Sequence, residues 1–159
     1  MVGNVERLMQ DELWPVTVRA EARYKLGHGA DPAKLVTPED VDRVIDELLT
    51  GGPKYQTLAQ IHSMERERTW AGAFDHELVV GANAELNAGI MTYMDEFGNF
   101  ATVGDPGSRK EPLYHLMGHM RELPDECEIS LDLVRQAAKE FVFAGGVRPT
   151  CVAWKPIEW

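Results

Sequence analysis

The side chains in this sequence that could do chemistry are a few carboxylates, a tyrosine and several histidines. Asp75, His76 and Glu77 are consecutive. Because neighbouring residues of a strand point to opposite faces, only Asp75 and Glu77 could act together on one side. Such a carboxylate pair beside Tyr93 could transfer protons if it lined a pocket. One hypothesis is therefore a small-molecule-binding protein or biosynthetic enzyme that uses Asp75, Glu77, Tyr93 and His115.

Metal and nucleophilic chemistry find less support. His115 and His119 are four residues apart, but the run 113–120 is predicted as a strand, on which they would lie roughly 13 Å apart. We therefore expect no metal site and no cofactor. The sequence has no glycine-rich phosphate loop and no G-x-S-x-G motif, and the surroundings of Cys127 and Cys151 carry no catalytic signature. Both thiols are expected to be reduced.

The charge of the chain favours a protein partner. The 159 residues include 26 Asp and Glu against 16 Lys and Arg, a net charge of −10. This charge repels phosphate backbones and anionic lipid surfaces, so we expect no direct nucleic-acid or membrane binding. Acidic loops could instead face a basic protein, with Trp70 as an anchor, although solvated loops are the simpler interpretation of each cluster. The candidate partner-binding acids are Asp95, Glu96, Glu122, Asp125, Glu126 and Glu128.

The elements that would position these residues can be predicted from periodicity and from capping residues. One helix is expected from the cap Thr37 to a stop at Gly51, and a second over Ser130–Ala144 with a stop at Gly145. Strands are expected over 14–25, 55–62, 77–82, 87–94, 100–103, 113–120 and 148–154.

This order predicts an α+β fold: a single domain over 1–159, with its core over about 12–154. The sheet would be mostly antiparallel and curved, with about six to seven strands and two main helices. The chain opens without an apolar leader and has no apolar run long enough for a membrane span. A cytoplasmic protein is therefore expected.

Several segments resemble the immunity protein 1 family of bacterial polymorphic toxin systems. They are the strand from Trp14, the run 75–81, the run 89–93, the region from Tyr114 to Ile129, and the run 145–154. The resemblance covers about residues 12–154. It places six residues on family-like positions: Asp75, Glu77, Tyr93, Glu128, Arg148 and Trp154.

The resemblance implies a strand-rich α+β fold and binding rather than catalysis. Members of this family are thought to neutralise a cognate toxin, often a nucleic-acid deaminase, by occupying its active-site cleft. An acidic protein would suit a cleft that is basic because it grips nucleic acid. The main hypothesis is therefore an immunity-like protein that blocks the basic cleft of a toxin through its acidic loops.

Overall fold

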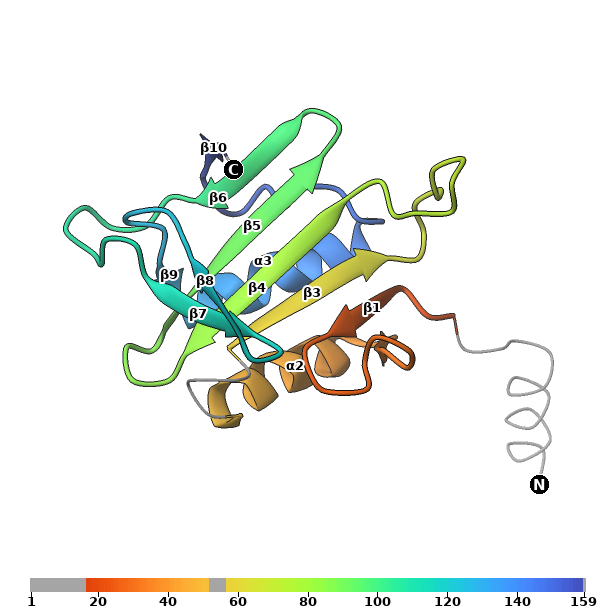
Figure 1. Ribbon diagram of the computed structural model, residues 1–159, viewed down its shortest axis with the longest axis horizontal. Helices are drawn as coiled ribbons and strands as arrows, with labels where there is room; N and C mark the ends of the chain where they lie inside the picture. The colour runs from red at the N-terminus through yellow and green to blue at the C-terminus, as the bar shows by residue number, and fades with distance from the viewer. Residues whose placement is uncertain (1–16, 52–56, 159) are drawn as a thin grey trace, which may run out of the picture.

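The computed structural model describes residues 17–51 and 57–158, and its centre is one twisted antiparallel sheet with two helices on one face (Figure 1). The strands of the sheet run in the order β10 (Trp154–Ile157), β6 (Gly98–Thr102), β5 (Ala88–Asp95), β4 (Glu77–Asn83), β3 (Leu58–Ser63), β1 (Ala20–Arg23) and β2 (Ala33–Leu35). A short eighth strand, β9 (Ile129–Ser130), pairs with β5. The helices are α2 (Pro38–Thr50) and α3 (Leu131–Phe143), and the predicted α+β class is confirmed.

The two helices begin at the predicted capping residues. The hydroxyl of Thr37 accepts a hydrogen bond from the N–H of Asp40 at 3.3 Å, and the Asp40 carboxylate accepts one from the N–H of Thr37 at 3.0 Å. This reciprocal capping box satisfies two backbone donors that the first turn would otherwise leave free. The Ser130 hydroxyl caps α3 by accepting from the N–H of Leu133 at 3.3 Å.

The helices and a hairpin cover opposite faces of the sheet, and each makes its own core. The apolar stripes of α2 and α3 pack on the strand residues of the first face, including Leu78, Val80 and Met91. On the second face, the hairpin of β7 (Leu113–Leu116) and β8 (His119–Glu122) encloses a smaller core around Ile90 and Tyr114. The hairpin crosses in front of the sheet and the helices lie behind it (Figure 1).

The predicted strand over 113–120 is wrong, because the chain reverses in its middle. Met117 and Gly118 both have positive φ, 48° and 84°, which is the backbone of a two-residue hairpin turn. Leu116 consequently pairs with His119, and His115 with Met120. Alternation then places the two histidines on opposite faces of the hairpin instead of along one strand.

Two other predicted strands start too early. Residues 14–16 of the first one lie outside the described residues, and β1 begins only at Ala20. The last strand begins at Trp154, not at Arg148. The preceding segment bonds to α3 instead of to the sheet, because the Glu140 carboxylate accepts hydrogen bonds from the N–H and the hydroxyl of Thr150.

Three connections meet at one end of the sheet. Residues 64–76 join β3 to β4, the turn at 96–97 joins β5 to β6, and the segment that follows α3 begins there with residues 144–147. This last segment then runs to the other end of β6, where the N–H of Val103 donates to the carbonyl oxygen of Ala153. We call the end where the three connections meet the loop end of the molecule. It lies on the right-hand side of Figure 1.

Candidate functional site

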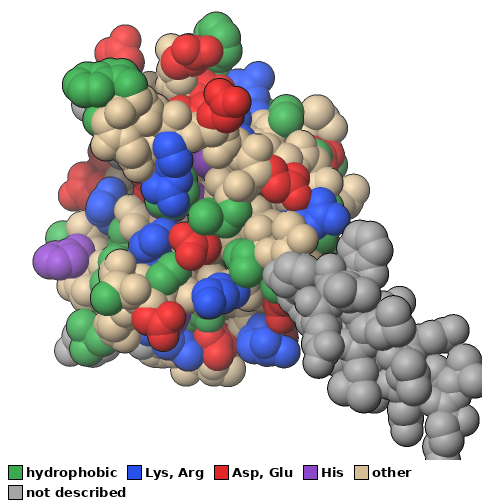
Figure 2. All heavy atoms as spheres, turned by 90° about the vertical axis from the view of Figure 1, so that its right-hand side faces the viewer, with side chains coloured by type: hydrophobic (Ala, Val, Ile, Leu, Met, Phe, Trp, Pro, Cys, Tyr) green, Lys and Arg blue, Asp and Glu red, His purple; other side chains and the backbone are tan. Residues whose placement is uncertain are grey.

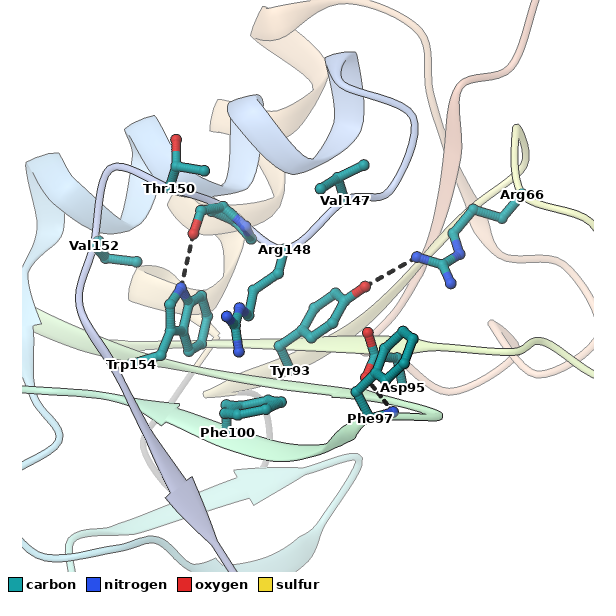
Figure 3. Close-up of a pocket in the computed structure, with 11 residues that line it drawn as sticks. Arg66, Tyr93, Asp95, Phe97, Phe100, Val147, Arg148, Thr150, Val152 and Trp154 are labelled. Atoms are coloured by element: carbon teal, nitrogen blue, oxygen red, sulfur yellow. Dashed lines mark hydrogen bonds between the residues drawn. The ribbon is translucent and has the colours of Figure 1, made fainter.

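A groove of about 590 Å³ opens at the loop end, between the β5–β6 turn and the segment 147–154 (Figure 3). Its apolar surface is mainly aromatic, and its charged side chains are two arginines and one aspartate. The residues that give it this character are Tyr93, Phe97, Phe100, Trp154, Arg66, Arg148 and Asp95.

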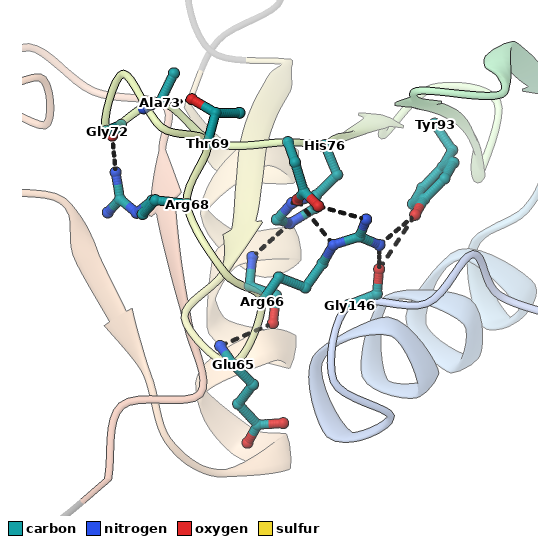
Figure 4. A network of polar contacts seen from close by, with 11 residues as sticks. Glu65, Arg66, Arg68, Thr69, Gly72, Ala73, His76, Tyr93 and Gly146 are labelled. Atoms are coloured by element: carbon teal, nitrogen blue, oxygen red, sulfur yellow. Dashed lines mark hydrogen bonds and ion pairs between the residues drawn. The ribbon is translucent and has the colours of Figure 1, made fainter.

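One end of the groove is closed by Arg66, whose guanidinium joins three parts of the chain (Figure 4). Its Nε and Nη2 each donate to a carboxylate oxygen of Asp75 at 2.9 Å. Its Nη1 donates to the hydroxyl of Tyr93 and to the carbonyl oxygen of Gly146, both at 3.0 Å. Hydrogen bonding to Arg66 lowers the pKa of Asp75 to about 2. This bidentate pair therefore stays ionised at neutral pH and holds the wall in place.

His76 extends the same network into the core. Its Nε2 accepts a hydrogen bond from the N–H of Ser63 at 2.8 Å, so the proton of the neutral ring is on Nδ1. Nδ1–H donates to Asp75 at 2.9 Å. Burial lowers the pKa of His76, which favours this neutral form. Because both ring nitrogens are occupied, the Asp75–His76 pair holds the fold and offers no free base.

Gly146 is the position where the network needs a glycine. Its φ is +83°, and a Cβ atom there would lie 2.5 Å from the Cβ of Ser63. A side chain would therefore be strained by its backbone conformation and would also clash with β3. The Gly146 carbonyl oxygen accepts from the Tyr93 hydroxyl at 3.2 Å as well as from Arg66.

The middle of the groove is occupied by Arg148. Its side chain points between Trp154 and Tyr93 (Figure 3), and its guanidinium carbon lies 4.2 Å from the centre of the Phe100 ring. This arrangement is a cation–π contact. Trp154 forms the neighbouring wall and is fixed by a 2.7 Å hydrogen bond from its Nε1 to the carbonyl oxygen of Pro149.

Only part of the predicted acidic surface lies at the β5–β6 turn. Asp95 ends β5 and pairs with Gly98, and Glu96 follows it in the turn. The second acidic segment lies beyond the other end of β6, because the N–H of Gly104 donates to the carbonyl oxygen of Glu126 at 2.7 Å. At about 3.3 Å per residue, the extended chain from Gly98 to Gly104 spans about 20 Å. The acids that lie on that distant side are Glu122, Asp125 and Glu126.

Positive and negative side chains interleave on the loop end. Figure 2 shows this end, and Lys and Arg side chains there alternate with Asp and Glu. The loop end is therefore not uniformly acidic, and the partner-binding role of its acids stays a prediction. Any partner bound here would meet charges of both signs.

Comparison with known proteins places this architecture in a family. The family model described as immunity protein Imm1 matches residues 29–156. The chain belongs to the Imm1 immunity protein family. The match includes the whole groove and all three connections of the loop end.

The other comparisons add little. One similar solved structure is described as a hypothetical protein from Neisseria gonorrhoeae; it has 9% sequence identity and a TM-score of 0.39, and the match covers 84% of this chain and 90% of that one. No curated protein matches the chain. An immunity-type role therefore rests on membership of the Imm1 family.

Glu128 does not belong to an acidic surface, contrary to the sequence-based prediction. It is only 6% exposed. Both of its carboxylate oxygens accept from Arg109 at 2.8 Å, and one also accepts from the hydroxyl of Tyr114 at 2.6 Å. These hydrogen bonds lower the pKa of Glu128 against the opposing effect of its burial. Its position near β9 ties the loop around Arg109 to the hairpin, which is a structural role.

The structure does not gather the four residues of the enzyme hypothesis. Asp75 and Tyr93 are linked through Arg66 on the helix-covered side of the sheet. Glu77 lies on the opposite side, in a shallow hollow of about 300 Å³ with Thr92 and Arg121, where burial raises its pKa. His115 is in the β7–β8 hairpin on that second side.

No cluster of three or more His, Cys, Asp or Glu side chains that could hold a metal ion occurs within residues 17–51 and 57–158. In the same residues, no helix is long and apolar enough to cross a membrane.

Three exposed apolar side chains mark the loop end. Trp70, in the first connection, is fully exposed, and its role as an anchor stays a prediction. Phe97 in the β5–β6 turn is 81% exposed, and Val147 in the third connection is 58% exposed. Sequence analysis missed Phe97 and Val147, although one signal was available for Phe97. A large aromatic residue in the short connection between the strands expected over 87–94 and 100–103 has no strand neighbour to bury it.

Proposed function

We propose that this Imm1 protein neutralises a toxin domain by binding it with the loop end. The observation that carries the proposal is that Trp70, Phe97 and Val147 are exposed on three separate connections at one end of the sheet. Soluble domains seldom leave large apolar side chains grouped on their surface unless a partner covers them. Trp in particular is enriched among the residues that dominate binding energy.

The charges around these side chains suit a partner with basic groups. Asp95 and Glu96 flank Phe97 and can approach a basic rim around the cleft of a toxin. Asp125 and Glu126 lie beyond the other end of β6, where Lys155 donates to the carbonyl oxygen of Asp125, so they would not approach the rim that Asp95 and Glu96 face. In this proposal the turn at 95–97 and Trp70 enter or cover the active-site cleft of a bacterial polymorphic toxin, such as a nucleic-acid deaminase.

The test uses the toxin domain encoded beside the gene of this protein. The two proteins are co-expressed, cell survival is scored, and the complex is measured by size-exclusion chromatography and calorimetry. We expect protection and a dissociation constant on the order of 10 nM. Trp70→Ala and Phe97→Ala should each weaken binding by about 10-fold or more.

Leu26→Ala is the matched control. Leu26 is 93% exposed, but it lies in the connection between β1 and β2, at the opposite end of the sheet from the loop end. Its removal should leave the dissociation constant unchanged. If the wild-type protein neither protects the cell nor forms a complex, or if all three variants bind equally well, the proposal is wrong.

A further inference from the structure

Most polar groups in the groove are already bonded within the protein. Arg66 uses its guanidinium on Asp75, Tyr93 and Gly146, and Trp154 Nε1 donates to Pro149. The hydroxyl of Thr150, at the rim, donates to Glu140 at 2.9 Å. These groups shape the groove, but they have little capacity left for a ligand.

Arg148 differs from these groups. Among the described residues, no hydrogen bond or ion pair joins its guanidinium, whose carbon lies over the Phe100 ring at 4.2 Å from the ring centre. An arginine has five N–H donors. Because none of these donors is bonded within the described residues, they are available to an occupant of the groove. A planar guanidinium can donate two parallel hydrogen bonds, one to each oxygen of a carboxylate.

The surroundings of Arg148 select among anions. Asp95 lines the same groove, Glu96 is its neighbour, and the whole chain has a net charge of −10. A polyanion such as a nucleic acid, or a doubly charged phosphate, would be repelled by this field. A single carboxylate with apolar flanks is favoured, because aromatic rings supply most of the remaining wall.

We propose that the groove receives one acidic side chain of the bound toxin, whose carboxylate pairs with Arg148. This inference rests on the proposed function and specifies the chemistry of the partner. The Asp or Glu would lie on a segment of the toxin that enters between Phe97 and Trp154, while Asp95 and Glu96 face basic groups around that segment. The contact surface of the toxin would then be basic with one acid in it, and Arg148 would select for that acid.

The first test needs no toxin. Full-length protein labelled with ¹⁵N is titrated with millimolar acetyl-Phe-Glu-Phe-amide, with its Gln counterpart and with inorganic phosphate, while the Arg148 Nε–H and Trp154 Nε1–H signals are followed. The Glu peptide should shift both signals, and Arg148→Gln should abolish the response. Equal responses to the three probes, including none to any of them, would overturn the proposal, as would a larger response to phosphate.

The second test uses the toxin domain and separates the two proposals. Arg148→Gln should weaken toxin binding by about 10- to 100-fold, as expected for a charged hydrogen-bonded pair. Arg148→Lys keeps the charge but loses the paired N–H donors, so its affinity for the toxin should lie between those of wild type and Arg148→Gln. Arg43→Gln removes an exposed arginine of α2 with the same change in net charge and should bind like wild type. Circular dichroism and thermal unfolding show whether each variant is folded.

A double-mutant cycle identifies the partner residue. Each Asp and Glu on the toxin surface is changed to Asn or Gln, and one such change should weaken binding to wild type but not to Arg148→Gln. If wild type binds the toxin and Arg148→Gln binds equally well, this inference fails and the proposed function stands. If wild type does not bind, the proposed function fails and this inference with it. If the protein self-associates and Arg148→Gln abolishes this self-association, the groove binds a second copy of the protein. That result would also overturn the inference of a toxin carboxylate.

Discussion

Arg66 donates to the hydroxyl of Tyr93 at 3.0 Å, and both side chains donate to the same carbonyl oxygen, that of Gly146. This relationship joins the first connection of the loop end to β5 and to the segment that follows α3. The walls of the groove are therefore held by one guanidinium that also carries the ion pair with Asp75. Rigid walls lower the entropic cost of binding, because less of the surface must be ordered when a partner arrives.

Arg66→Leu should destabilise the protein, because it removes several hydrogen bonds and leaves the Asp75 carboxylate and the Gly146 carbonyl with fewer partners. Since the pair is partly exposed, we expect a loss of about 2–3 kcal/mol in the free energy of unfolding. Urea denaturation at neutral pH measures it. Arg43→Leu, at an exposed position of α2, should cost less than about 0.5 kcal/mol. Similar losses for both variants would contradict a structural role of the network.

The stability of the protein should fall as the pH is lowered from about 7 to about 4, partly because of His62. Burial, together with the neighbouring His76 and the positive groups Arg23 and Arg68, lowers the pKa of His62 to about 4. The unfolded chain, with a histidine pKa of about 6.5, binds the proton first, so protonation favours unfolding over this range.

His62→Phe should make this pH dependence shallower, by about 1–3 kcal/mol between pH 7 and pH 4. The new ring can keep the stacking on Phe74, whose ring centre lies 4.0 Å from that of His62. Urea midpoints measured over the pH range test the prediction. His76 also has a lowered pKa, so some slope should remain. An unchanged slope in His62→Phe would show that His62 contributes nothing.

Glu128→Gln should destabilise the protein without altering toxin binding. It removes the charge of a buried carboxylate that pairs with the partly exposed guanidinium of Arg109, and we expect a loss of about 1–3 kcal/mol. Chemical denaturation measures the loss, and calorimetry with the toxin is run well below the unfolding midpoint. Glu122→Gln, an exposed acid on β8, should change stability by less than about 0.5 kcal/mol. If the folded Glu128→Gln protein binds the toxin more weakly than wild type, Glu128 is part of the binding surface and the prediction is wrong.

The double variant Asp95→Asn with Glu96→Gln should slow the association with the toxin and reduce its salt dependence. Charges at the rim of an interface act mainly on the association rate, here by a few-fold at low ionic strength. Stopped-flow or surface-based kinetics at several salt concentrations measure the effect. Glu122→Gln with Asp125→Asn changes the net charge equally at the distant side. If this control slows association as much as the Asp95→Asn, Glu96→Gln variant does, the association rate depends on the total charge of the protein and not on the charges of the loop end.

The sequence by itself determined the elements whose signals are local. Thr37 and Ser130 begin the two helices because a hydroxyl at each of these positions can cap the following turn. Runs rich in residues that favour strands, separated by a short polar turn, placed β4 and β5 closely. The α+β class, the antiparallel sheet and the Imm1 resemblance followed from such elements in their order.

Only the tertiary structure decided how residues that are distant in sequence combine. The carboxylate of Glu128 looked like part of an acidic loop, and it is buried because Arg109 and Tyr114 reach it from other segments. The groove exists because Arg66 reaches across 80 positions to Gly146. Such contacts depend on packing and on the accumulated geometry of several connections, which no local spacing encodes. The same geometry leaves the N–H donors of Arg148 open to a partner.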